Sequence, residues 1–321
     1  MPVRRVPAVL LLLCLMTSGL TSCLARRRAI TRFETETGLR KAIEAKQLVV
    51  HYQPIVSLAE RRIRGFEALV RWIHPERGLV PPGEFISIAE ESDLIVLIGR
   101  WVLREACLRV AEWQKSLSPA SPLNVSVNVS SRQLSDPGLA DDVREALAES
   151  GLSPQCLSLE LTESSILGNS DQTRATLDRL RSMGVRLEID DFGTGYSSLS
   201  YLQQLPLGAL KIDRSFIRGL NSDKGSIDIV RAIMQLAHSL RLEVIAEGVE
   251  NGEQLTRLRE LGCNLIQGFV FSRPVAAEEA EHLYWKIHDS VSASLLAVNA
   301  GSCDPGLING EIESAVALGA R

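Results

Sequence analysis

Hydrophobic and polar positions follow two alternating patterns along most of the chain. Short stretches rich in Val, Ile and Leu are typical of buried strands, and they alternate with longer stretches whose apolar residues recur at helical spacing. Eight strands are predicted, at residues 48–56, 63–72, 123–130, 156–163, 185–191, 209–213, 242–248 and 264–268. Helices are predicted at 39–47, 85–92 and 94–116, and between the later strands, including a short helix between residues 191 and 209.

This succession of strands and helices predicts one α/β domain. About eight strands with intervening helices over roughly 240 residues have the size and order of a (β/α)8 barrel. The composition is 45% hydrophobic, which is too apolar for a disordered chain. The net charge is −4 and the basic residues are scattered, so a nucleic-acid duplex is not an expected partner.

Seven of the predicted strands carry a polar or charged residue at or near the C-terminal end. These residues are Glu67, Asn128, Glu160, Asp190 with Asp191, Lys211, Glu247 and Gln267. Taken singly, each could be a helix cap or a solvated loop residue. In a barrel, however, the strand ends converge on one rim, and a rim so rich in acids would be unstable without cations.

The side-chain types indicate which cation. Carboxylates and an amide oxygen, with no His or Cys among them, favour Mg²⁺ or Mn²⁺ over Zn²⁺. Two ions that share Asp190 would explain the adjacent pair Asp190 and Asp191, and paired ions are a common device for phosphoester hydrolysis. Lys211 adds a positive charge and a hydrogen-bond donor, so the pattern predicts a phosphodiester site.

Several motifs resemble, in order and spacing, those of the EAL-domain cyclic di-GMP phosphodiesterases. They are "YQPIV", "GFEALVRW", "VNVSSRQL", "ELTES", "IDDFGTGYSSLSYL", "LKIDRSF", "IAEGVE" and "QGFVFSRP". The similarity runs from about Leu39 to Ile287, and we assign residues 36–288 to this domain. The resemblance implies a modified (β/α)8 TIM-like barrel in which one strand runs antiparallel to the others.

The resemblance also implies roles for individual residues. The implied metal ligands are Glu67, Asn128, Glu160, Asp190, Asp191 and Glu247, and the implied catalytic residues are Glu67, Asp191, Lys211 and Glu247. The implied substrate-binding residues are Gln53, Arg71, Glu250 and Gln267. Glu163 is expected to hold the loop at residues 192–198, in which Gly193 and Gly195 supply backbone freedom.

The implied reaction is the hydrolysis of cyclic di-GMP to linear pGpG by water activated at two Mg²⁺ or Mn²⁺ ions. Ca²⁺ is expected to support it poorly, and a homodimer is expected. One alternative is a cyclic di-GMP receptor without activity, although such proteins usually lose residues that are present here. A second is an unrelated metal-dependent barrel enzyme, such as an aldolase or isomerase.

The two ends of the chain carry separate signals. Residues 1–28 have a basic start, an apolar run at 6–16, a lipoprotein-like box ending in Cys23, and three arginines at 26–28. They are interpreted as an uncleaved inner-membrane anchor, an export signal or a mis-set start. Because cyclic di-GMP is a cytoplasmic messenger, we expect the domain to lie in the cytoplasm. Residues 289–321 are predicted to form a loosely ordered tail.

Cysteine usage agrees with a reducing compartment. The six cysteines are Cys14, Cys23, Cys107, Cys156, Cys263 and Cys303, and none of them forms a CxxC pair. We therefore expect reduced, mostly buried thiols.

Overall fold

The computed structural model describes residues 32, 34–116, 122–167, 171–195, 205, 207–221 and 224–286. The predicted leader and tail lie outside these residues, as do positions 196–204 of the stretch for which a short helix is predicted. Contacts divide the chain into two compact units, Met1–Leu48 with Trp72–Leu94 and Val49–Arg71 with Ile95–Arg321.

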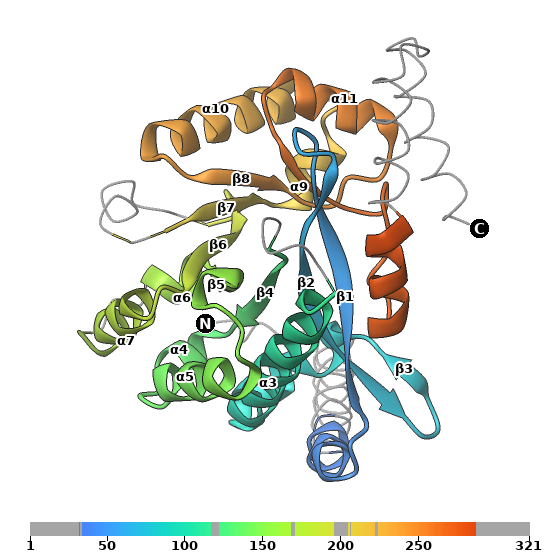
Figure 1. Ribbon diagram of the computed structural model, residues 1–321, viewed down its shortest axis with the longest axis vertical. Helices are drawn as coiled ribbons and strands as arrows, with labels where there is room; N and C mark the ends of the chain where they lie inside the picture. The colour runs from blue at the N-terminus through green and yellow to red at the C-terminus, as the bar shows by residue number, and fades with distance from the viewer. Residues whose placement is uncertain are drawn as a thin grey trace, which may run out of the picture. The chain divides into compact units, whose positions relative to one another are not determined.

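The second unit is built on a closed barrel (Figure 1). Its strands are β1 (Leu48–Ser57), β2 (Arg62–His74), β4 (Asn124–Val129), β5 (Leu157–Thr162), β6 (Arg186–Phe192), β7 (Ala209–Ile212), β8 (Glu243–Ala246) and β9 (Leu265–Gln267). They lie in the order β1-β9-β8-β7-β6-β5-β4-β2, and pairing of β1 with β2 closes the ring. Strand β1 is antiparallel to β9, whereas the pairs from β2–β4 round to β8–β9 are parallel. The predicted eight-stranded barrel with one antiparallel strand is confirmed.

Helices follow most strands and cover the outside of the barrel. They are α3 (Leu94–Gln114), α4 (Ser131–Leu134), α5 (Leu139–Ser150), α6 (Glu163–Leu167), α7 (Asp171–Ser182), α9 (Arg214–Arg218), α10 (Lys224–Leu240), α11 (Gly252–Glu260) and a helix at 277–286, with the 3-10 turn η2 (Pro154–Cys156) before β5. Helix α10 lies against β7 and β8, as Figure 1 shows. None of the described helices is both long and apolar enough to cross a membrane.

The outward faces of the strands are apolar because helices cover them. Val127, Val129 and Leu159 line a small cavity together with Leu103 of α3 and Leu139 of α5. The opposite face of the same strands points into the barrel and carries polar side chains instead. Adjacent residues of a strand therefore differ little in burial and much in chemistry, which leaves the barrel interior free to build a site.

Part of the barrel interior is a packed apolar core. Ile55, Ala209, Ile245 and Leu265 form one buried cluster contributed by four strands. Side chains that fill a barrel in this way hold the strand ends in a fixed arrangement, because a close-packed core resists deformation.

The first unit contains a helix at 34–44, β3 (Gly78–Val80), the 3-10 helix η1 (Pro82–Glu84) and α2 (Ile86–Glu91). Trp72–His74 of β2 pair antiparallel with β3, a hairpin that the sequence analysis missed. The prediction that Glu67 lies near the C-terminal end of its strand is therefore wrong. Glu67 lies in the middle of β2, because the strand continues into this hairpin.

The buried cysteines agree with the expectation of reduced thiols. Cys107, Cys156 and Cys263 are free and buried. Burial raises the pKa of the Cys107 and Cys263 thiols to about 12, so both stay protonated and unreactive at neutral pH. Cys14, Cys23 and Cys303 lie outside the described residues.

Candidate active site

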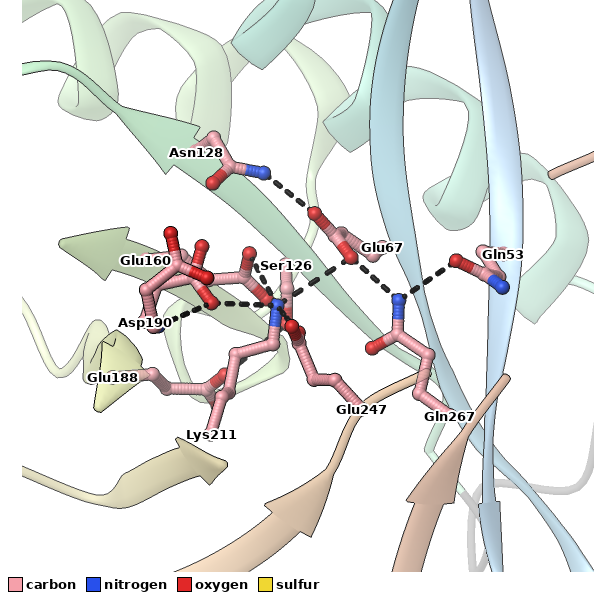
Figure 2. Close-up of polar contacts among 11 residues, drawn as sticks. Gln53, Glu67, Ser126, Asn128, Glu160, Glu188, Asp190, Lys211, Glu247 and Gln267 are labelled. Carbon is pink, nitrogen blue, oxygen red and sulfur yellow. Dashed lines mark hydrogen bonds and ion pairs between the residues drawn. The ribbon is translucent and has the colours of Figure 1, made fainter. Parts of the chain in front are cut away.

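Lys211 of β7 lies at the centre of a buried cluster of carboxylates (Figure 2). Its Nζ is 2.5 Å from Glu247 Oε1, 2.8 Å from Glu160 Oε2, and 3.4 Å from both Glu67 Oε2 and Asp190 Oδ1. These four acids come from β2, β5, β6 and the residue after β8, so the barrel brings together side chains that are far apart in sequence.

Amide side chains hold Glu67 from two sides. Asn128 Nδ2 donates to Glu67 Oε1 at 2.6 Å, and Gln267 Nε2 donates to Glu67 Oε2 at 2.5 Å. Gln267 also donates to Gln53 Oε1 at 3.1 Å, and Gln53 donates to the Ser272 carbonyl at 3.2 Å. Figure 2 shows this chain of amides running from the carboxylate cluster to β1. Glu67 is therefore fixed in orientation before any ligand arrives.

The acids of the cluster differ in how easily they ionise. Burial alone would raise the pKa of Glu67, but the charge of Lys211 and the two amide donors hold it below its usual value. Burial and the charge of Glu67 raise the pKa of Glu160 well above its usual value. Burial also raises the pKa of Glu247 to about 8, although Lys211 acts in the opposite direction. Lys211 itself stays charged, because the surrounding carboxylates outweigh the effect of its burial and raise its pKa.

The adjacent pair Asp190 and Asp191 lies at the edge of this cluster. Oxygen atoms of Asp190, Asp191 and Glu247 all lie within 4.8 Å of one another. The backbone of Asp191 is in the left-handed region, with φ 53°, and its N–H donates to Asp190 Oδ1 at 3.0 Å. Burial and the negative charges of Asp190 and Asp213 raise the pKa of Asp191 to about 6. This backbone turn is what lets two neighbouring residues present their carboxylates to one place.

Glu163 holds the glycine loop that follows β6. Its Oε2 accepts the Gly193 N–H at 3.4 Å and the Gly195 N–H at 3.2 Å. Gly193 has φ 96°, which suits glycine, and a Cβ at Gly195 would lie 3.1 Å from the same Glu163 oxygen. The predicted pairing of Glu163 with this loop is present for residues 193 and 195, while residues 196–198 lie outside the described part of the chain.

The remaining predicted site residues lie outside the cluster. Arg71 is part-buried and donates to the Val70 carbonyl at 2.9 Å. Glu250 lies in the segment between β8 and α11, with Oε1 4.0 Å from Arg218. Neither belongs to the ring around Lys211, and their contact with substrate stays a prediction.

The donor set fits a divalent cation. Neither oxygen of Glu160 has a hydrogen-bond partner of good geometry in the described part of the chain, although Lys211 Nζ is at ion-pair distance. A buried carboxylate in this state costs free energy, and a bound cation would remove that cost. Oxygen donors alone, with excess negative charge, suit Mg²⁺ or Mn²⁺.

Two residues of the site were missed in the sequence. Asp213 follows β7 and caps α9 through Ser215 N at 3.0 Å, and it also interacts with Asp191. Glu188 is buried two positions before Asp190 on the same strand. Both could have been found from the alternation of polar and apolar residues in "RLEIDD" and "LKID", since residues two apart on a strand share a face.

Sequence comparisons identify the family of the chain. Residues 36–274 match the sequence model described as the EAL domain. The chain is 47% identical over 248 residues to "Cyclic di-GMP phosphodiesterase NbdA" of Pseudomonas aeruginosa, a match covering 77% of this chain and 31% of that protein. It is 43% identical over 250 residues to "Cyclic di-GMP phosphodiesterase PdeR" of Escherichia coli, covering 78% of this chain and 37% of that protein. The chain thus spans about a third of the length of these curated relatives.

Solved structures show the same relationship. The structure named "PaMucR Phosphodiesterase, c-di-GMP complex" matches with a TM-score of 0.74 and 46% identity, covering 77% of this chain and 99% of that one. The EAL domain of Mycobacterium smegmatis DcpA matches with a TM-score of 0.63 and 38% identity, covering 74% of this chain and 98% of that one. Barrel, motifs and matches agree, and the chain belongs to the EAL domain family.

Proposed function

We propose that this chain hydrolyses cyclic di-GMP to linear pGpG. The observation that carries the proposal is the buried ring of Glu67, Glu160, Asp190 and Glu247 around Lys211. Relatives named as cyclic di-GMP phosphodiesterases, and a related structure named as a cyclic di-GMP complex, support this choice of substrate. The assignment is a proposal for this chain because it spans only part of those curated relatives.

The residues that would hold two divalent ions are Glu67, Asn128, Glu160, Asp190, Asp191 and Glu247. When bound there, such ions would lower the pKa of water and offset charge on the phosphoryl oxygens. Mg²⁺ and Mn²⁺ suit the all-oxygen donor set, whereas Ca²⁺, which is larger and looser in geometry, is expected to support turnover poorly.

The chain's own side chains would orient the reactants. The Lys211 ammonium is held by ion pairs with four carboxylates, and it would direct a water molecule toward phosphorus. Arg71 carries a part-buried guanidinium that would pair with a phosphate of the substrate. Gln53, Gln267 and Glu250 would contact the substrate around this centre, and Glu163 would position the loop at 192–198 beside Asp191.

We also propose that the barrel acts in the cytoplasm as a homodimer, with residues 1–28 providing attachment to the inner membrane. A cytoplasmic messenger as the substrate supports this location. A reporter fused after Arg321 should be active only in the cytoplasm. Activity in the periplasm, or lipid on Cys23, would contradict the proposed location without affecting the proposed chemistry.

The test of function is incubation of the full chain with cyclic di-GMP and Mg²⁺ or Mn²⁺, followed by chromatography of the products. We expect pGpG with either ion and none in EDTA. Tight binding of cyclic di-GMP without cleavage under any divalent ion would favour a receptor instead.

A further inference from the structure

His51 lies on the inward face of β1. Its neighbour Tyr52 points outward, because the Tyr52 ring packs against Trp113 of the covering helix α3, with ring centroids 5.0 Å apart. Side chains alternate between the two faces of a strand, so His51 and Gln53 both point to the inside of the barrel. The same face continues to Ile55, which belongs to the packed apolar core.

The direction of β1 places His51 at the mouth of the barrel. Strand β1 runs antiparallel to β9, and Ile55 pairs with Gln267 at the C-terminal end of β9. Residues that precede Ile55 therefore extend beyond this end, toward the rim on which the carboxylates lie. Gln53 accepts a hydrogen bond from Gln267, and His51 follows about 7 Å farther along the strand. His51 is only part-buried, as this position requires.

The two ring nitrogens of His51 have different roles. Nδ1 lies 3.4 Å from the carbonyl oxygen of Pro274. Because a carbonyl oxygen only accepts, Nδ1 carries the proton in this hydrogen bond, and Nε2 of the neutral ring is an acceptor. Among the residues that the structure describes, none donates a hydrogen bond to Nε2.

The surroundings of His51 keep the ring neutral. Burial lowers the pKa of His51 below its ordinary value, and the positive charge of Arg71 acts in the same direction. The hydrogen bond to Pro274 and the charge of Glu279 oppose this effect without reversing it. At neutral pH His51 is therefore an uncharged hydrogen-bond acceptor near the guanidinium of Arg71.

A neutral acceptor at the mouth suits one part of a cyclic dinucleotide better than the others. Ionised phosphates carry no hydrogen-bond donor, and they suit the guanidinium of Arg71 instead. The N–H donors of cyclic di-GMP lie on the guanine edge, at N1 and at the exocyclic amine. In adenine, N1 carries no hydrogen and position 2 carries no amine, so this edge would present an acceptor to the Nε2 acceptor. Such an arrangement selects against adenine.

We propose that His51 is a specificity-determining residue, whose Nε2 accepts a hydrogen bond from an N–H on the edge of one guanine base. The inference rests on the proposed function for the identity of the substrate. The tautomer of His51 is a separate property of the free protein, and it can be measured without substrate.

Binding of cyclic di-GMP and cyclic di-AMP to the full chain tests the proposal, by calorimetry in Ca²⁺ to limit turnover. His51→Phe keeps an aromatic ring and removes the acceptor. It should weaken binding of cyclic di-GMP about 10-fold without weakening that of cyclic di-AMP. His51→Gln, whose side-chain oxygen can accept, should restore part of the loss. His238→Phe, at an exposed position of α10, is the matched control.

Two results of this comparison would overturn the proposal. One is wild-type affinity for cyclic di-GMP in His51→Phe. The other is equal weakening of both nucleotides, because a contact with the ribose, or packing of the ring alone, would not distinguish the two bases.

A second measurement examines the ring itself. Nitrogen NMR of the free protein near pH 8 should show His51 with the proton on Nδ1 and none on Nε2. Saturating cyclic di-GMP should then shift the Nε2 resonance. A proton on Nε2 in the free protein, or an Nε2 resonance that cyclic di-GMP leaves unchanged, would overturn the proposal.

Turnover separates this inference from the proposed function. His51→Phe should raise KM about 10-fold with kcat within about threefold, because the contact is made equally in the ground state and the transition state. A lowered kcat with unchanged KM would overturn the role in substrate selection. A wild type that binds cyclic di-GMP without cleaving it would overturn the proposed hydrolysis, and the binding and NMR measurements would still decide the role of His51.

Discussion

Nζ of Lys211 lies 2.8 Å from Oε2 of Glu160, and both side chains are buried. In a single buried ion pair the two opposite charges would balance each other. This lysine, however, also lies near the carboxylates of Glu67, Asp190 and Glu247. One ammonium cannot neutralise four carboxylates, so part of the cluster must take up protons or cations. The raised pKa values of Glu160 and Glu247 show this excess of negative charge.

The adjacent aspartates should respond differently to the same loss of charge. Asp190 meets Lys211 inside the cluster, whereas Asp191 turns outward and interacts with Asp213. Asp190→Asn should therefore weaken all metal binding and with it substrate binding. Asp191→Asn should keep one ion and much of the substrate affinity, while turnover falls by more than the roughly 10 to 100-fold typical of altered metal surroundings.

Metal titration, calorimetry with cyclic di-GMP and turnover on both variants would check this. Asp178→Asn, at an exposed position of α7, is the matched control. Equal loss of metal binding in the two variants, or near wild-type turnover in Asp191→Asn, would contradict the account. It would show that Asp190 and Asp191 do not have different roles toward two metal ions.

Glu163 should control the glycine loop through its charge. Glu163→Gln weakens two charge-assisted hydrogen bonds to Gly193 and Gly195, each worth on the order of 1.5–3 kcal/mol when intact. Turnover should fall by about 10-fold or more, and the loop amides should exchange faster with solvent. Ser164→Ala at the exposed neighbouring position is the control. Unchanged amide exchange at 193 and 195 would show that Glu163 does not hold the loop.

Metal affinity should depend on pH. The pKa of Asp191 is raised to about 6 and that of Glu247 to about 8, so both acids bind protons more readily than usual and must lose them to ligate a cation. Affinity for Mn²⁺ should rise from below pH 6 to about pH 8 and then level off. Calorimetry in buffers of different ionisation enthalpy should detect proton release, and Glu247→Gln should remove the upper part of the rise. Affinity that is constant between pH 6 and pH 8 would contradict these assignments.

The barrel could be predicted because each strand and helix has its own period in the sequence, and the polar strand ends marked the rim. The hairpin of β2 and β3 could not, since Ile73 and Leu79 are paired yet exposed and give no signal of burial. Only the family resemblance indicated the antiparallel direction of β1, because strand periodicity is the same in both directions.

Glu188 was missed for a physical reason. In "RLEID" the polar residues alternate with Leu187 and Ile189, a pattern that usually indicates a polar face in water. In this barrel helices cover the outer face, so the apolar residues point outward and the polar residues point into the interior. All three of Leu187, Glu188 and Ile189 are buried, and burial alone does not distinguish the two faces.

The most direct test of the central claim is hydrolysis of cyclic di-GMP by the wild type and by Glu67→Gln, at saturating Mn²⁺ and with folding checked by circular dichroism. Two amide side chains and Lys211 fix the orientation of the Glu67 carboxylate. The Glu67→Gln variant keeps the size of the side chain and loses its charge. Glu76→Gln, on the exposed turn between β2 and β3, is the matched control. We predict pGpG from the wild type and the control, and turnover at least about 100-fold lower in Glu67→Gln. Turnover in Glu67→Gln within about threefold of the wild type would show that this carboxylate cluster is not the catalytic centre.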